Sequence, residues 1–97
     1  MCGAKKGGLD LKGVDIDKEA VIQGQVLRGE DPVGGAYVRL LDASGEFTAE
    51  VVSSPAGQFR FFAAPGTWTV RALSRHGNGG TTVAADRGVN SIAVSVG

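Results

Sequence analysis

Cysteine and histidine are scarce in this sequence, and neither sign of charge is in excess. One Cys and one His among 97 residues can form neither an intrachain disulfide framework nor a zinc site. Ten basic and ten acidic residues give a formal net charge of zero, which leaves no electrostatic signature of nucleic-acid or anionic-lipid binding. No apolar run approaches the roughly 20 residues that span a bilayer. We therefore expect no nucleic-acid partner, no membrane partner and no metal or cofactor.

The first residues of the sequence do not predict a secretory signal. The first eight residues contain Lys5 and Lys6, and no apolar stretch follows them. Because a free thiol also fits a reducing compartment, we expect the protein to be cytoplasmic. Residues 1–19 contain all four lysines and no aromatic residue. We interpret them as a flexible N-terminal tail and lead-in to one domain over 20–97.

Valine and glycine, by contrast, are abundant. Twelve valines favour strands, because a side chain branched at Cβ suits a pleated, half-buried surface. Sixteen glycines supply the turns that many short strands require. Glycine- and proline-rich stretches separate the apolar segments, and we expect 77–80 (GNGG) to be a flexible tip. Apolar and polar residues alternate with a period of two in the remaining segments, which are 20–26, 36–41, 47–51, 59–63, 68–72, 83–85 and 92–96.

The spacing of these segments predicts an all-β fold. Six or seven short strands recur roughly every 8–12 residues, and no window has the length and period of a helix. We therefore expect a single antiparallel β-sandwich of about seven strands. The predicted core consists of the inward-facing residues Ile22, Val26, Val38, Leu40, Phe47, Val51, Phe59, Phe61, Trp68, Val70, Ile92 and Val94.

Four motifs in order along the chain carry a family resemblance. They are I-x-G-x-V (22–26), P-V-G-G-A-x-V-x-L (32–40), G-x-F-x-F (57–61) and P-G-T-W-T-V (65–70). Together they resemble the transthyretin-like, carboxypeptidase-regulatory-like β-sandwich. That family uses its domains mostly as folding partners, binding modules or oligomer interfaces. Its hydrolytic members depend on His and Arg residues with a C-terminal motif, which S-V-G (95–97) and the lone His76 do not match.

Two longer stretches resemble a narrower group. V-R-L-L-D-A-S-G-E-F-T-A-E-V (38–51) and F-R-F-F-A-A-P-G-T-W-T-V-R-A-L (59–73) are similar to a small uncharacterised bacterial family, a domain of unknown function. Its members are often encoded beside a thiosulfate sulfurtransferase. The resemblance therefore implies a setting in sulfur metabolism and a sulfurtransferase as the protein partner, but it implies no established activity.

Cys2 has the most distinctive chemistry in the sequence. Removal of Met1 would leave an N-terminal cysteine, whose thiolate the α-ammonium group, Lys5 and Lys6 would stabilise. One hypothesis is that Cys2 accepts persulfide sulfur from a sulfurtransferase partner, carried on a mobile arm. The alternative is an incidental thiol on a disordered tail.

Outward-facing apolar and arginine side chains form a second candidate site. On the predicted register, the residues that point away from the core are Tyr37, Arg39, Leu41, Arg60, Phe62, Arg71 and Leu73. Aromatic and aliphatic groups mixed with arginine are typical of protein interfaces. We also expect cross-strand pairing of the arginines with Glu46 and Glu50. The alternative is a set of scattered surface apolar groups with weak ion pairs.

Other residues with useful chemistry are weaker candidates. His76 precedes GNGG, so we expect a solvated side chain. Trp68 has the same period-2 phase as the inward-facing Val70, which favours a place in the core over sugar stacking. Asp42, Glu46 and Glu50 are weak candidates for calcium ligands, and we do not expect them to form a shared site.

Two functions remain open from the sequence. The first is a non-enzymatic interaction or accessory module, which presents its arginine-aromatic face or a strand edge to a protein partner or to a second copy in a homo-oligomer. The second is a sulfur-relay protein whose chemistry resides in Cys2. No nucleophile, base and orienting group can be named together, so we expect no catalytic residue. Cys2→Ser separates the two functions, because only the relay would lose sulfur transfer.

Overall fold

The computed structural model describes residues 19–97, which form eight strands and no helix. The strands are β1 (Ala20–Arg28), β2 (Asp31–Pro32), β3 (Tyr37–Leu41), β4 (Phe47–Val52), β5 (Gln58–Ala63), β6 (Gly66–Ser74), β7 (Gly77–Ala85) and β8 (Gly88–Ser95). No helix in this part of the chain could therefore cross a membrane. The tail predicted over 1–19 lies outside the described residues, apart from Glu19.

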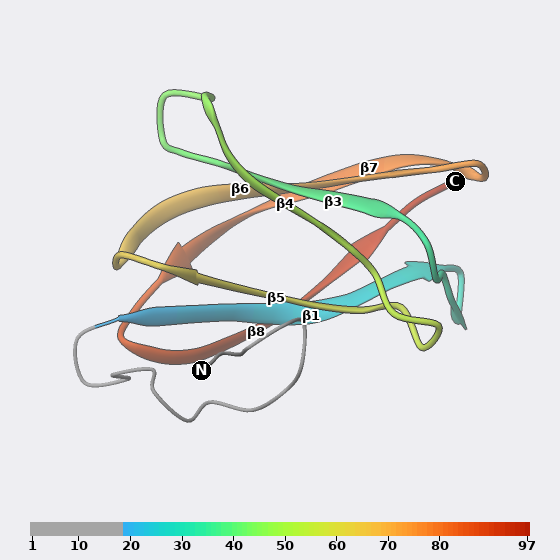
Figure 1. Cartoon of the computed structure of the whole chain (residues 1–97), viewed down its shortest axis with the longest axis horizontal. Helices are drawn as coiled ribbons and strands as arrows, with labels where there is room; N and C mark the ends of the chain where they lie inside the picture. Colours follow the sequence, from blue (N-terminus) through green and yellow to red (C-terminus); the bar gives the residue numbers. More distant parts are fainter. Residues whose placement is uncertain (1–18) are drawn as a thin grey trace.

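The eight strands form two stacked sheets (Figure 1). In the first sheet, β1 pairs with β2 and β5 on one side and with β8 on the other. The second sheet has the order β4-β3-β6-β7. All pairings are antiparallel except that of β1 with β8, which run parallel from Ala20 opposite Gly88 to Leu27 opposite Ser95. The predicted all-β sandwich is confirmed, with one parallel pair added to it.

The core lies between the sheets, where the period-2 alternation places it. Eight predicted core residues are buried, namely Ile22, Val26, Val38, Leu40, Phe59, Phe61, Val70 and Val94. Val51, Trp68 and Ile92 are partly buried and pack against them. The rings of Phe59 and Phe61 lie 6.0 Å apart between centroids at an angle of 53°, within the range of favourable aromatic pairs.

Phe47 does not belong to the core, contrary to the prediction. Its side chain is 62% exposed. The register between β3 and β4 shifts between Leu40, which lies opposite Ala49, and Leu41, which lies opposite Phe47. Thr48 is the extra residue of this β-bulge, and one extra residue turns every side chain beyond it to the other face. Phe47 therefore points outward beside Leu41.

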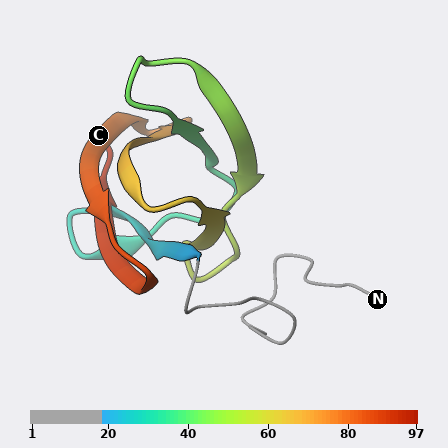
Figure 2. The same cartoon turned by 90° about the vertical axis from the view of Figure 1, so that its left-hand side faces the viewer.

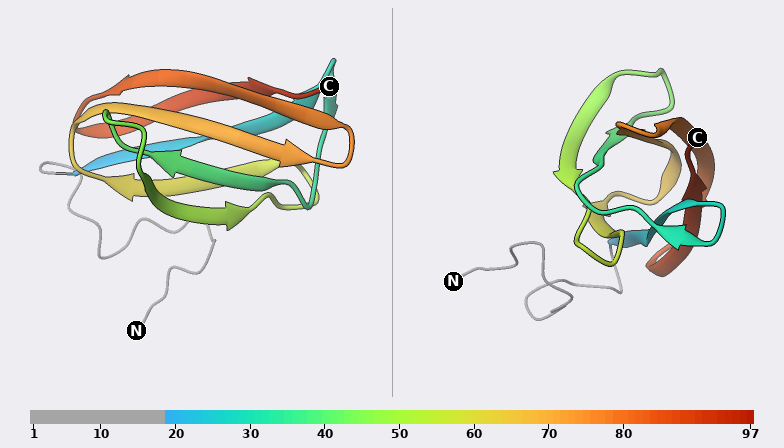
Figure 3. Two further views of the ribbon diagram at one scale, coloured as in Figure 1. Left: turned by 90° about the horizontal axis from the view of Figure 1, so that it is seen from above. Right: turned by 90° about the vertical axis from the view of Figure 1, so that its right-hand side faces the viewer.

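The GNGG segment is not a flexible tip. Gly77–Gly80 begins β7 and pairs with β6, and the turn between the two strands consists of Arg75 and His76. A Cβ at Gly79 would overlap the carbonyl oxygen of Ser95 on β8. The end-on views show β7 and β8 side by side, so that they close one side of the sandwich (Figures 2 and 3). Glycine is needed here for a close approach between strands rather than for flexibility.

Candidate functional site

Five of the seven predicted interface residues gather on the outer face of the second sheet. Tyr37, Arg39 and Leu41 come from β3, while Arg71 and Leu73 come from β6. Tyr37 lies opposite Leu73, and Arg39 lies opposite Arg71. Their side chains share one face because alternate residues of paired strands point the same way. We call this surface the second-sheet face.

Strand β4 extends the second-sheet face with two exposed apolar residues. Val52 lies opposite Tyr37, and the bulge brings Phe47 opposite Leu41. Tyr37 is 53% exposed and Val52 is 58% exposed. A shallow hollow of about 390 Å³ adjoins Tyr37 and Leu73. The face therefore carries apolar groups toward both ends, separated by a charged row.

The charged row runs across β4, β3 and β6. Arg39 Nε donates a hydrogen bond to Glu50 Oε2 at 2.8 Å, which confirms the cross-strand pairing expected for Glu50. Both side chains are substantially exposed, so solvent screens the pair and its contribution to stability is small. Arg71 lies opposite Arg39 on the other side. The row thus contains one carboxylate and two guanidinium groups, in the order Glu50, Arg39, Arg71.

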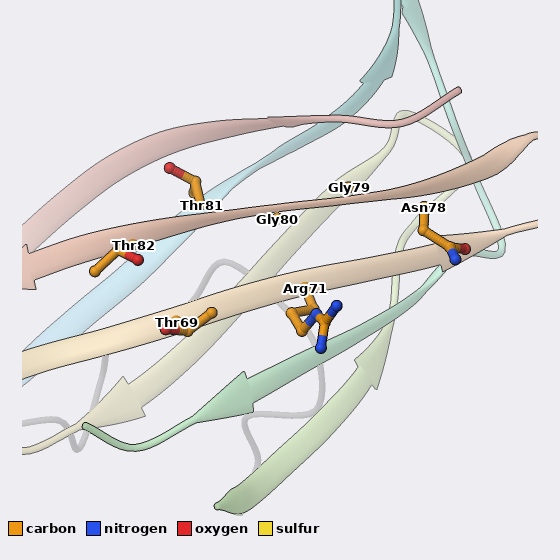
Figure 4. Close-up of a pocket in the computed structure, with 7 residues that line it drawn as sticks. All are labelled: Thr69, Arg71, Asn78, Gly79, Gly80, Thr81 and Thr82. Carbon is orange, nitrogen blue, oxygen red and sulfur yellow. The ribbon is translucent and has the colours of Figure 1, made fainter. Parts of the chain in front are cut away.

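Beyond Arg71, the face is hollowed at Gly79 and Gly80, where β7 carries no side chains. Gly80 lies opposite Arg71, and together with Gly79 it forms the floor of a depression of about 430 Å³. Figure 4 shows Arg71 and the polar side chains of Thr69, Thr82 and Asn78 around this depression. We call it the glycine hollow.

The other two predicted interface residues belong to the opposite surface. Arg60 and Phe62 lie on β5 in the first sheet, so they do not share a face with the other five. Arg60 donates to the side-chain oxygen of Gln23 from Nε at 3.0 Å and from Nη2 at 2.6 Å. Phe62 is 37% exposed, and Val89, also on this sheet, is 47% exposed. The set predicted from the sequence is thus divided between two outer faces.

Comparison with known protein families identifies this chain. A family model described as "Protein of unknown function (DUF1416)" matches residues 2–96. The chain belongs to this family. An uncharacterized protein of Mycolicibacterium smegmatis is 63% identical over 86 residues, which cover 87% of this chain and 96% of that protein. Two uncharacterized proteins of Mycobacterium tuberculosis are 54% identical over 99 residues, which cover 99% of each chain.

The structural comparison adds a protein of similar fold. A crystal structure of a DUF3823 family protein from Parabacteroides merdae matches with a TM-score of 0.63 at 16% sequence identity. The match covers 81% of this chain and 46% of that chain. It supports the β-sandwich architecture alone.

The acidic residues in the described part of this DUF1416 chain do not converge on a metal site. Asp42 Oδ1 accepts hydrogen bonds from the amide of Ser44 at 2.9 Å, from its hydroxyl at 2.7 Å and from the amide of Glu46 at 3.0 Å. The bonds from Ser44 and Glu46 lower the pKa of Asp42, because they stabilise the charged carboxylate. Asp42 thus closes the β3–β4 turn, while Glu50 pairs with Arg39. Across residues 19–97, no three His, Cys, Asp or Glu side chains are grouped to hold a metal ion.

The remaining candidates fall in different places. Cys2, the candidate sulfur acceptor, lies outside the described residues. His76 is exposed in the β6–β7 turn, where a solvated side chain was expected. Trp68 packs against the core, and its Nε1 donates to the carbonyl oxygen of Ala64 at 2.8 Å. This confirms a structural place for Trp68.

Ser53 is a structural residue that no sequence pattern indicated. Its hydroxyl accepts a hydrogen bond from the amide of Ala36 at 2.9 Å and donates one to the carbonyl of Val33 at 2.8 Å. Both partners lie 17 to 20 residues away along the chain. Ser53 therefore fixes the loop from which β3 enters the second-sheet face.

Proposed function

We propose that this domain is a non-enzymatic protein-interaction module that binds its partner through the second-sheet face. The observation that carries the proposal is the grouping of exposed Tyr37, Phe47 and Val52 around the charged row of Arg39, Glu50 and Arg71. Large apolar side chains in contact with arginine are favoured in protein interfaces, where they become buried on binding. Isolated exposed apolar groups are common on any surface, but here they occupy neighbouring strands of one sheet.

A free strand edge adds to this surface. In the part of the chain that the structure describes, β4 pairs only with β3, so its outer edge has unpaired backbone groups. Such an edge can accept an extended segment of a partner by strand addition. The bulge at Phe47 restricts regular pairing to the stretch beyond it. A partner that contacts the face would then also contact this edge.

The family resemblance favours a partner in sulfur metabolism, a sulfurtransferase included. Capture from the native cell tests this directly, with an affinity tag placed after Gly97 so that the N-terminus stays free. A second copy of the chain is the other form of partner. Light scattering on the purified protein separates the two, since self-association raises the measured molar mass above the 9.9 kDa of a single chain.

The decisive variant is Tyr37→Asp, which places a charge among the apolar residues of the second-sheet face. We expect it to reduce capture of the partner about tenfold or more, because a large aromatic residue often dominates interface energetics. Phe62→Asp, on the outer face of the first sheet, is the matched control and leaves capture unchanged. Thermal unfolding of both variants checks that they remain folded.

Two results would contradict the proposal. One is loss of capture in Phe62→Asp with full capture in Tyr37→Asp, because this would place the interface on the first sheet. The other is loss of capture in Cys2→Ser with both face variants unaffected, because this would favour sulfur relay over a binding face.

A further inference from the structure

We propose that the glycine hollow receives a carboxylate side chain of the protein partner, which pairs there with Arg71. This inference rests on the proposed function, and it names the chemical group that the partner presents. The hollow lies within the second-sheet face, next to the apolar pair of Tyr37 and Leu73.

The first step is the unequal pairing of the two arginines in the charged row. Arg39 binds Glu50 at 2.8 Å. Among residues 19–97, no carboxylate pairs with Arg71, which is exposed beside Arg39. The row therefore carries one uncompensated positive charge. A guanidinium group presents a planar array of donors that matches a carboxylate in a bidentate geometry.

The second step is the space next to that charge. Gly80 lies opposite Arg71 and places no side chain on the outer face of β7. The resulting hollow of about 430 Å³ has room for a carboxylate and the methylene groups that carry it. Thr69, Thr82 and Asn78 line it with groups that can donate hydrogen bonds, and no acidic side chain is among the lining residues (Figure 4).

The third step distinguishes a partner's side chain from a free anion. A single exposed guanidinium holds a free anion weakly, because water screens the charges. A carboxylate that arrives on a protein brings apolar neighbours, which pack on Tyr37 and Leu73 and exclude water from the pair. Lower local polarity then strengthens the interaction between the charges. The arrangement thus suits an acidic side chain flanked by apolar residues.

The test uses two capped pentapeptides added to the ¹⁵N-labelled full-length protein. One is acetyl-Ser-Val-Glu-Val-Ser-amide, and the other has glutamine in place of the glutamate. We expect the glutamate peptide to shift the amide signals of Gly79, Gly80 and Thr82 and the Nε–H signal of Arg71. Its affinity should exceed that of the glutamine peptide at least fivefold.

Two variants locate the preference. Arg71→Gln removes the fivefold difference between the peptides, whereas Arg75→Gln, which removes the same charge from the β6–β7 turn, retains it. Sodium acetate provides the free-anion arm, and we expect it to bind more weakly than the glutamate peptide. Arg71 and Arg75 are both exposed, so we expect both variants to fold.

Three results would overturn the inference. They are equal binding of the two peptides, a preference that persists in Arg71→Gln, and acetate binding as tight as that of the glutamate peptide, which would indicate a site for free anions. None of these measurements requires the native partner. Equal peptide binding together with loss of capture in Tyr37→Asp would thus overturn the carboxylate inference and leave the interaction module standing.

Discussion

Ser53 shows how one side chain can hold a loop of this sandwich. It is the buried polar residue of the described chain, at 4% exposure, and its hydroxyl joins the backbones of Val33 and Ala36. Its own amide donates to the carbonyl of Ala36 at 2.9 Å. A hydroxyl is required here because the amide of Ala36 and the carbonyl of Val33 are buried and need a hydrogen-bond partner within the protein.

Ser53→Ala should therefore lower the free energy of unfolding by about 2 kcal/mol, because a buried donor and a buried acceptor lose their partner. Urea denaturation monitored by tryptophan fluorescence measures the change. Ser91→Ala is the control, since Ser91 is exposed on β8 and its replacement should change stability by less than about 0.5 kcal/mol. Equal midpoints for the two variants would refute the role of Ser53.

At this scale, sequence patterns predict burial well where the side chain is apolar. Ile22 and Val26 on β1 or Val38 and Leu40 on β3 follow from alternation alone, because a strand turns successive side chains to opposite faces. Ser53 could not be found in this way. Its burial depends on contacts with residues far away along the chain, and serine is common in exposed turns.

Among the strands, β7 and β8 lie so close together that one position on β7 must be glycine. Gly79 faces the backbone of β8 at Ser95, whereas Gly80 points to the outer face, where a Cβ would lie 3.2 Å from the carbonyl oxygen of Val70. Neither Gly79 nor Gly80 has a positive φ. Steric room, rather than backbone conformation, therefore distinguishes the two positions.

Gly79→Ala should destabilise the protein by about 3 kcal/mol, because β7 and β8 must separate to admit the methyl group. Gly80→Ala, one residue further on, should cost less than about 1 kcal/mol, because a shift of a few tenths of an ångström accommodates its methyl group. Thermal unfolding of the two variants compares them directly. A smaller loss of stability in Gly79→Ala than in Gly80→Ala would contradict the close approach of the strands.

The strands also mark the limit of prediction from sequence. Alternation indicated which residues point outward, and for Tyr37, Arg39 and Leu41 this was right. Alternation does not say which sheet a strand joins. Because β5 joins the first sheet, Arg60 and Phe62 lie on the opposite surface. The bulge that turned Phe47 outward depends on the pairing of two strands, which a single strand's pattern does not contain.

Over the whole molecule, the first and last described strands depend on each other. β8 pairs with β1 along eight residues, and it contributes the buried side chain of Val94. The segment after it adds buried Val96, whose amide donates to the carbonyl of Leu27 at 2.9 Å. The sandwich is thus completed only when β8 pairs with β1.

A chain that ends at Arg87 should therefore fail to fold, because β1 loses a neighbouring strand and the core opens on that side. We expect a collapsed amide proton spectrum and no cooperative thermal transition. A chain without Gly97 alone is the control, and it should retain dispersed signals. A dispersed spectrum for the chain that ends at Arg87 would show that β8 is dispensable.

The parallel pairing of β1 and β8 also determines how the domain responds to mechanical force. Because the two strands run in the same direction, tension applied between Glu19 and Gly97 pulls them along their axes in opposite senses. The hydrogen bonds between them are then loaded together in shear, rather than opened one at a time as in a zipper. A chain held at these two points would be mechanically resistant along this direction, even though no disulfide reinforces residues 19–97.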